Sequence, residues 1–549
     1  MNSPVRNKKL YLILSLPLLA VIFIRPFISE MAYPLMGAYL RIAVLAVFLA
    51  SLFFSRAFSL NNYFSKPLLA CLFALIISLF YSINILSSLH QVYQISALFS
   101  LFFLASNMSN KETKKLRAII LFTALLISVY AIYQYVWGFE HLKEYLAKNL
   151  KDSLEAKYFR EILFTKRAIA TFFSPNMLGC YLAMTIPLCA GSILDKINLK
   201  KPYIFQSACL ALTLTALVLT KSLGVWISLA FGALVFVILS NRLRRSTRLI
   251  ICALMLLMPA YILFLRFDMF ADFANQQNTI LQRLSFWKSS LAMIKDFPLT
   301  GVGAGNFSNI YLKYKYFLAN ETMFAHNIFL QAWAETGILG IISIIWLLAA
   351  FIKTSFKIEK NLITIGLIAS CSVFIVNNML DFSYFIPQVS FLWWLYLGLL
   401  SRARKTDNVK SNNTTRSLAL AIVFILILLN IKSAIALNYF QKGEYEKAIS
   451  TEPYNDLYYA AMKKYNKAIE LNPYYPFYHK ALALSYLKNG MTEKAILEFE
   501  KASSLYPASQ YFSQQLYDLY LKTGKLNKAE KQGSKLKKFH LLYSGYHIR

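Results

Sequence analysis

Residues 325–338 read AHNIFLQAWAETGI, and the apolar run that they open continues to residue 352. An imidazole stands at the threshold of this run, and amide and carboxyl side chains lie inside it. Asn327, Gln331 and Glu335 are four residues apart, so a helix would carry them on one face. Ionisable groups inside a membrane helix are costly and by default mark a functional site. The stretch therefore predicts a membrane helix with a site at its entrance.

The composition is that of an integral membrane protein. Of the 549 residues, 57% are hydrophobic and 15% are charged, and the mean hydropathy is +0.47. These values lie far from those of soluble chains. Apolar runs long enough to cross a bilayer of about 30 Å recur along the first four-fifths of the chain. No small-residue cleavage site follows the first run, so we expect a retained span and not a signal peptide.

We expect thirteen spans and hence an all-α fold, a polytopic membrane helical bundle. Basic residues flank alternate connections, beginning with Arg6, Lys8 and Lys9. By the positive-inside rule these connections are cytoplasmic, so the N-terminus is expected inside and the C-terminus outside. The predicted spans are residues 10–25, 34–55, 67–86, 92–107, 117–138, 172–194, 203–220, 222–240, 248–266, 327–352, 362–380, 384–400 and 417–436.

The formal net charge of +32 does not by itself indicate a nucleic-acid partner. The basic residues are dispersed among membrane flanks and the C-terminal region, and no recognised nucleic-acid motif is present. All six cysteines lie inside predicted spans, which excludes a disulfide framework and zinc-ligand spacing. We therefore expect no nucleic acid, no metal and no cofactor.

The chain changes character after residue 436, where tyrosine- and lysine-rich amphipathic segments begin. A shift of 34 residues superposes Pro473 on Pro507 and Gly490 on Gly524, and a 34-residue helix-turn-helix period is the tetratricopeptide signature. The best unit is 476–509, with a partial unit on either side. We therefore divide the chain into a membrane domain, 1–436, and an exported tetratricopeptide domain, 437–549. Such α-solenoids commonly bind a protein on their concave face, although passive stabilisation is the alternative.

Two long outer connections, residues 139–171 and 267–326, are expected to carry the chemistry, because long loops in compact proteins are often functional. The first ends in KRAIATFFSPN, residues 166–176, and the second contains QRLSFW, residues 282–287. The second also contains the glycine-rich turn PLTGVGAGNF, residues 298–307.

These segments resemble the signatures of the O-antigen ligase and Wzy-type polymerase superfamily, membrane glycosyltransferases whose donor is a glycan linked to a lipid diphosphate. Residues 167–176 are similar to the family's R-x-x-G-T-F-x-x-P-N, with Ala170 at the glycine position, and residues 283–287 to its R-x-x-x-W. The resemblance covers about residues 160–400. It implies that Arg167, Arg283 and His326 take the places of the two arginines and the histidine that the family uses.

The implied chemistry suits these side chains. A guanidinium gives bidentate, permanently charged contacts to phosphate and neutralises charge on the leaving oxygen. Histidine titrates near physiological pH and is suited to remove the proton of an acceptor hydroxyl. The loops hold no Asp-x-Asp pair, so we expect metal-independent transfer, which the family implies is inverting. Further candidate substrate-binding residues are Asn176, Lys221, Gly303, Gly305, Asn327, Gln331 and Glu335.

One segment departs from the family pattern. Where the family often reads T-x-S-R-G, this chain has Thr220-Lys221-Ser222-Leu223-Gly224, so the arginine is absent and Lys221 is only a candidate substitute. Arg41, inside the second predicted span, has two readings of equal weight, a residue that snorkels to the headgroups and a residue that contacts substrate.

The function is therefore expected to be that of a glycan ligase in the bacterial cytoplasmic membrane. Its partners would be the lipid-linked donor and a glycan, lipid or protein acceptor, as in lipopolysaccharide assembly or protein O-glycosylation. A Wzy-type polysaccharide polymerase would use the same donor chemistry and stays an alternative. A lipid or sugar transporter is the alternative from another class, but no inverted repeat of broken helices is evident.

Overall fold

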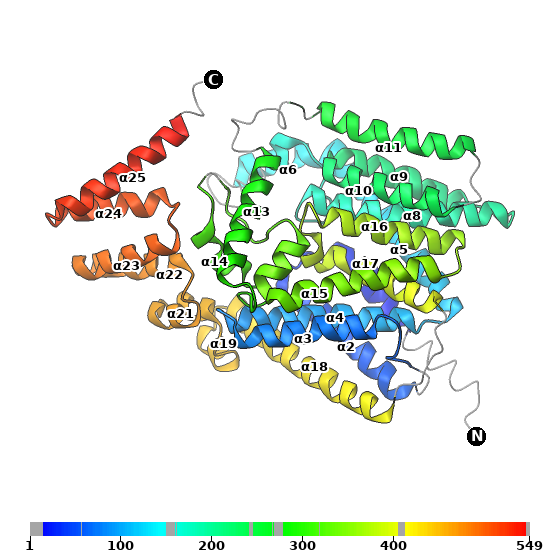
Figure 1. The fold of residues 1–549 in the computed structure, drawn as a ribbon, viewed down its shortest axis with the longest axis horizontal. Coiled ribbons are helices and arrows are strands. Elements are labelled where there is room, and N and C mark those ends of the chain that lie inside the picture. The colour runs from blue at the N-terminus through cyan, green and yellow to red at the C-terminus, as the bar shows by residue number, and fades with distance from the viewer. Residues whose placement is uncertain are drawn as a thin grey trace. The chain divides into compact units, whose positions relative to one another are not determined.

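The computed structural model is built of helices joined by turns and short connections (Figure 1). No strand occurs among the residues that it describes, in agreement with the predicted all-α class. The described residues are 15–55, 58–149, 160, 162–240, 245–265, 267, 278–317, 319–404 and 412–544.

The chain forms two compact units, each assembled from distant segments. Unit 1 comprises Met1–Leu68, Tyr93–Leu265 and Trp346–Ile431, and unit 2 comprises Leu69–Val92, Arg266–Ile345 and Lys432–Arg549. Several long helices give residues to both units. This grouping follows packing and not chain order, so it does not test the predicted division at residue 436, which stays a prediction.

Unit 1 contains most of the apolar helices. A helical segment Ser15–Phe27 ends in the 3₁₀ turn η1, Arg25–Phe27. The other elements that lie wholly or largely in this unit are α2 Pro34–Phe54, α4 Ile85–Ser106, α5 Asn110–Tyr133, η2 Gln134–Gly138, α6 Phe139–Asn149, α8 Pro175–Asn198, α9 Ile204–Thr220, α10 Leu223–Leu239, α11 Arg245–Leu265, α16 Leu362–Asn377, η3 Ser383–Phe385, α17 Pro387–Ala403 and α18 Asn413–Gln441.

The centre of unit 1 is α16, which packs on α8 and α10; α8 also packs on α9, and α10 on α11 (Figure 1). Glycines allow these backbones to approach closely. A Cβ at Gly191 of α8 would lie 2.3 Å from the Leu362 carbonyl oxygen of α16, and one at Gly366 would lie 2.7 Å from the Pro187 oxygen. Small residues at helix crossings are typical of membrane bundles, where close backbone packing, and not the hydrophobic effect, drives the association of helices.

Each predicted span falls on a helix, although the first begins before the described residues. Six helices in the described part of the chain are long and apolar enough to cross a membrane: α2, α4, Asn110–Leu146, α8, α15 (Ile328–Lys357) and α18. Six shorter apolar helices accompany them. These helices fit a multi-pass membrane protein, and the number of thirteen spans stays a prediction.

Unit 2 combines part of α3, Ser65–Phe80, with the helices around the candidate site and the C-terminal helices. Around the site lie α13 Thr279–Asp296, α14 Phe307–Tyr314 and the first part of α15. The C-terminal helices are α19 Tyr445–Thr451, α20 Asp456–Ala461, α21 Tyr465–Leu471, α22 Pro476–Lys488, α23 Thr492–Leu505, α24 Gln510–Lys522 and α25 Leu526–Ser544.

The last four C-terminal helices, α22 to α25, follow the 34-residue sequence repeat closely. Each helix from α19 to α25 contacts the next, and the α24–α25 pair repeats α22–α23 after 34 residues. The helices α20 and α21 are much shorter, with 6 and 7 residues. The tetratricopeptide assignment stays a prediction.

The two long connections contain helices that the sequence did not predict. The first, residues 139–171, contains α6, and the second, residues 267–326, contains α13 and α14. Parts of both connections, residues 150–159, 161, 268–277 and 318, lie outside the described residues.

The α8–α16 crossing gives the first testable prediction. Gly191→Ala should lower the stability of unit 1, because the added methyl group meets a backbone oxygen that cannot rotate away; overpacking of this kind costs about 1–3 kcal/mol. Gly224→Ala in α10 is the matched control, since no atom lies within 4 Å of its Cβ position. Thermal unfolding of the detergent-purified protein measures both. Equal midpoints for the two variants would contradict the close contact.

Candidate functional site

In unit 1, the segment that begins at Arg167 is tied to the end of α9. The Arg167 guanidinium donates from Nε to the Thr220 carbonyl oxygen at 2.8 Å and from Nη2 to Asn176 Oδ1 at 2.9 Å. The backbone adds a bond from the Ala168 nitrogen to the Leu219 carbonyl, 3.0 Å long. The guanidinium plane is therefore held by two oxygens from different elements.

Asn176 stands in the first turn of α8, and the local sequence explains its position. Ser174 caps this helix by accepting from the Met177 nitrogen, and Pro175 opens it. Asn176 Oδ1 also accepts from Ser222 Oγ at 2.8 Å. One amide oxygen thus joins Arg167 to the segment after α9.

Ala170 has a left-handed backbone with φ 49°. It stands at the position where the family that the chain resembles has glycine. Such a conformation costs an L-residue roughly 1–2 kcal/mol. Gln134 Oε1 supports it by accepting from the Ile169 and Ala170 nitrogens, both at 2.9 Å. The chain therefore keeps the backbone turn that glycine would favour and stabilises it with a side chain from η2.

Lys221 also has a left-handed backbone, with φ 48°, and it ends α9. Its Nζ lies 5.9 Å from the ring centroid of Tyr135. Of the predicted residues, Arg167, Asn176 and Lys221 are therefore gathered in unit 1, around the end of α9 and the start of α8.

In unit 2, His326 lies two residues before α15 and has φ 54°, an uncommon backbone for a residue with a side chain. Its imidazole stacks on Phe286, with ring centroids 5.1 Å apart and planes at 24°. Phe286 is on α13, one turn after Arg283. The predicted histidine therefore contacts the helix that carries the predicted arginine, one turn away from it, and strained residues of this kind cluster at functional sites.

The polar residues of α15 fix the backbone next to His326. Gln331 Oε1 accepts from the Ala325 nitrogen at 2.5 Å, and its Nε2 donates to Glu335 Oε1 at 2.7 Å. This contact confirms that Gln331 and Glu335 share a helix face. Asn327 Oδ1 accepts from the nitrogens of residues 329 and 330 and so caps the helix. The predicted role of these three residues in binding substrate is not tested by these contacts.

The glycine-rich turn packs on the same helix. Gly301, Gly303 and Gly305 have positive φ of 66°, 93° and 74°, as a tight turn of glycines requires. The Gly303 nitrogen donates to the Glu335 carbonyl at 2.9 Å, and the Phe307 nitrogen donates to Glu335 Oε1 at 3.3 Å. The turn, Glu335 and the segment before His326 are therefore linked by one set of hydrogen bonds.

The same unit links this turn to the C-terminal helices. Asn306 Nδ2 donates to Ser82 Oγ and Ser88 Oγ, both at 2.9 Å, and to the Asn84 carbonyl at 3.2 Å. Asn84 Nδ2 in turn donates to Asp456 Oδ1 at 3.2 Å, at the start of α20. A buried polar path thus runs from the glycine-rich turn to the first short C-terminal helices.

Asp456 is the junction of that path. Besides Asn84, it accepts from Asn472 Nδ2 at 3.0 Å and from the Tyr478 hydroxyl at 2.8 Å. Burial and the neighbouring Asp456 carboxylate raise the pKa of Tyr478 above its ordinary value, so the hydroxyl stays a donor. Three donors from three segments therefore converge on one carboxylate.

Sequence reasoning missed the residues that support the predicted ones. Gln134 begins η2 and Asp456 begins α20, and no local sequence pattern marks either as a supporting residue. Phe286 had a detectable signal, because it is three residues after Arg283 and shares its helix face. Its contact with His326 joins segments 40 residues apart, which no local pattern reports.

Part of the chain matches a known protein family. Residues 208–345 match the family model described as O-Antigen ligase, Wzy_C. This stretch includes Lys221, Arg283 and His326, and it leaves Arg167, Asn176 and the C-terminal helices outside. No curated protein matches the chain. The match supports the O-antigen ligase superfamily and a membrane glycan ligase or polymerase.

The Asp456 junction gives the second prediction. Asp456→Asn should destabilise unit 2, because in either orientation the new NH₂ group faces an amide donor, that of Asn84 or that of Asn472; each buried unmade bond costs about 1–3 kcal/mol. Asp518→Asn, at an exposed residue that accepts only from Gln514 among the described contacts, is the control. Limited proteolysis of the C-terminal helices and thermal unfolding measure the effect, and an unchanged midpoint for Asp456→Asn would rule out the junction role.

Proposed function

We propose that this protein is a membrane glycan ligase that transfers a glycan from a lipid-diphosphate donor to an acceptor at the outer face of the cytoplasmic membrane. The observation that carries the proposal is the placement of His326, with its left-handed backbone, against α13 one turn from Arg283, inside the stretch that matches the O-antigen ligase family. The position matches the family signature, and the strained backbone supports a functional role.

Arg167 and Arg283 are assigned to the donor diphosphate. When the bond from the anomeric carbon to the diphosphate oxygen breaks, negative charge develops on that oxygen, and a fixed guanidinium stabilises it. The Thr220 carbonyl and Asn176 amide restrict the Arg167 plane, so little ordering is required when phosphate binds. Arg283 would present the second guanidinium from α13.

His326 is assigned as the general base. It removes the proton of the acceptor hydroxyl while the hydroxyl oxygen bonds to the anomeric carbon and the diphosphate leaves with the bonding electron pair. Attack opposite to the leaving group inverts the anomeric carbon. The stacking on Phe286 and the Gln331 bond to the Ala325 nitrogen hold the imidazole and its backbone in one orientation.

The other predicted residues are assigned to orientation and substrate contact. Asn176 and Lys221 would border the donor beside Arg167. Gly303 and Gly305 would shape the turn, because the Gly303 nitrogen already donates to the Glu335 carbonyl. Asn327, Gln331 and Glu335 would shape the acceptor side. The internal bonds of Gln331 and Glu335 favour a positioning role for these two.

A Wzy-type polymerase would use the same residues, because only the acceptor differs. The C-terminal helices favour the ligase, since an exported protein-binding module is easier to explain when the acceptor or a partner is a protein. A transporter is less well supported, because the sequence shows no inverted repeat of broken helices and the predicted site residues adjoin long connections.

The arginine assignment predicts that Arg167→Lys and Arg283→Lys lose most transfer activity, although charge is conserved, because an ammonium cannot make the planar bidentate contact. We expect a loss of about 10- to 100-fold, equivalent to one charge-assisted hydrogen bond. The matched control is Arg160→Lys, in the same connection as Arg167. Transfer from a purified lipid-diphosphate glycan measures the effect. Near-normal product from both variants would mean that these arginines only anchor their segments.

The base assignment predicts that His326→Gln abolishes transfer while donor binding stays within about twofold, because an amide keeps hydrogen bonding but cannot take a proton near neutral pH. His141→Gln, at an exposed histidine of α6, is the control. Transfer is followed across a pH series, with donor binding measured separately. A wild-type rate and pH profile in His326→Gln would make His326 structural and the base assignment wrong.

A further inference from the structure

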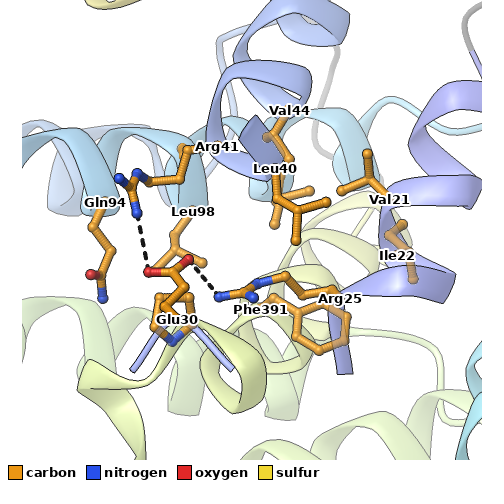
Figure 2. A pocket seen from close by; sticks show the side chains of 13 residues that line it. Val21, Ile22, Arg25, Glu30, Leu40, Arg41, Val44, Gln94, Leu98 and Phe391 are labelled. Atoms are coloured by element: carbon orange, nitrogen blue, oxygen red, sulfur yellow. Dashed lines mark hydrogen bonds and ion pairs between the residues drawn. The ribbon is translucent and has the colours of Figure 1, made fainter. Parts of the chain in front are cut away.

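A small cavity in unit 1 encloses two arginines and one carboxylate. Figure 2 shows Arg25 and Arg41 on either side of Glu30, with both guanidinium groups directed at it. Arg25 Nη2 donates to Glu30 Oε1 at 2.7 Å, and Arg41 Nη1 donates to Glu30 Oε2 at 3.1 Å. The three side chains are only 7%, 20% and 16% exposed, in the order Arg25, Arg41 and Glu30.

The charges in this cavity do not balance. Two guanidinium groups face one carboxylate, which leaves a net charge of +1, and the rest of the lining is apolar apart from Gln94. A buried cation without a counter-charge is costly in a protein interior and more so at membrane depth. The arrangement is therefore complementary to one further anion.

The surrounding elements hold this charge cluster in place. Gly37 leaves the space that Glu30 fills, since a Cβ there would lie 2.2 Å from Glu30 Cγ. The turn after Arg25 is fixed at Pro26, whose carbonyl accepts from Thr171 Oγ1 at 2.7 Å and from Gln388 Nε2 at 2.6 Å. The backbone next to Arg25 is thus held by hydrogen bonds from two other segments.

Arg41 keeps donor capacity toward the cavity. Its described hydrogen bonds use Nη1 toward Glu30 and Nε toward Asn430 Oδ1, the latter at 3.4 Å. Its Nη2 has no acceptor within the part of the chain that the structure describes. Both bonds are longer than the 2.7–2.9 Å of strong charge-assisted contacts, so an incoming oxyanion can replace them at small cost.

We propose that this cavity, the Arg25–Arg41 pocket, binds the phosphate group of a membrane lipid, and that Glu30, while it stays bonded to Arg25, occupies the anion position beside Arg41 when no lipid is bound. The cavity is only about 30 Å³, room for one or two water molecules, so the phosphate enters as Glu30 leaves Arg41. Phosphate oxygens then accept from both guanidinium forks. The apolar lining, including Leu40, Leu98 and Phe391, faces the first carbons of the lipid.

This exchange predicts that two substitutions change the affinity for the lipid phosphate in opposite directions. Glu30→Gln keeps the side-chain shape but removes the competing anion, so it should tighten phosphate binding several-fold. Arg41→Gln removes one fork and should weaken binding about tenfold or more, the effect of one charge-assisted hydrogen bond. A purely structural ion cluster gives no reason for the two variants to change lipid binding in opposite directions.

The test is lipid titration of the purified full-length protein, followed by native mass spectrometry, with phosphatidylglycerol, diacylglycerol and inorganic phosphate as separate probes. We expect phosphatidylglycerol to bind, diacylglycerol to bind at least tenfold more weakly, and inorganic phosphate to compete only at much higher concentration. Arg402→Gln is the control, because this substitution removes the same charge elsewhere in unit 1. Arg402 donates to the Met108 carbonyl and to Asn110 Oδ1. Its binding should equal that of the unaltered protein.

Three results would overturn the proposal. Equal binding of phosphatidylglycerol and diacylglycerol would show that only the apolar lining acts. Competition by inorganic phosphate at the same concentration as the lipid would assign a free-phosphate site. Unchanged binding in both Glu30→Gln and Arg41→Gln would show that the ion cluster is structural and does not bind lipid. If Arg41→Gln fails to fold, Arg41→Lys keeps the charge without the fork, and its affinity should fall between those of the other variants.

Discussion

The backbone break at Gly337 is the constraint on which the candidate site in unit 2 depends. With φ 64° and ψ −160°, Gly337 interrupts α15, and a Cβ there would lie 2.0 Å from the Leu299 carbonyl oxygen. The carbonyls of Ala334 and Glu335, just before the break, accept from the Val302 and Gly303 nitrogens. Irregular backbone at membrane depth is tolerated only when its polar groups are satisfied by protein or lie in a water-filled cavity. The break and the glycine-rich turn therefore require each other.

This mutual requirement explains why polar side chains of α15 stay buried. Glu335 binds the Phe307 nitrogen, Gln331 binds Glu335, and the other end of Gln331 holds the Ala325 nitrogen beside His326. Removing one member would leave its buried partners unpaired, at about 1–3 kcal/mol each. The free-energy cost of burying these polar groups in a membrane helix is thus offset by hydrogen bonds that also fix the backbone beside His326.

The sequence predicted the parts of this arrangement that follow from local pattern. Apolar runs located the membrane helices, because their length and composition are set by the bilayer. The glycines at 301, 303 and 305 predicted a turn, and all three have positive φ. The shared face of Gln331 and Glu335 followed from their spacing and is confirmed by their hydrogen bond.

The parts that could not be predicted depend on contacts between distant segments. Gly337 reads as an ordinary helix glycine until the 299–307 turn is seen to approach it. The support of Ala170 by Gln134 joins residues 36 apart, and the Asn84–Asp456 bond joins residues 372 apart. The helices α13 and α14 were missed because their apolar content is too low for a span. Propensity and periodicity carry no information on such pairs.

The arginines show how hydrogen-bond partners distinguish positions that look alike in sequence. Arg167 is held by a backbone carbonyl and a neutral amide, which orient its guanidinium group. Arg25 and Arg41 instead share a carboxylate, which cancels one of their two charges. An oxyanion that reaches the Arg25–Arg41 pocket therefore has to compete with Glu30. A guanidinium oriented by fixed oxygens suits a site that stabilises developing charge, whereas two arginines that share a carboxylate suit a site that exchanges one anion for another.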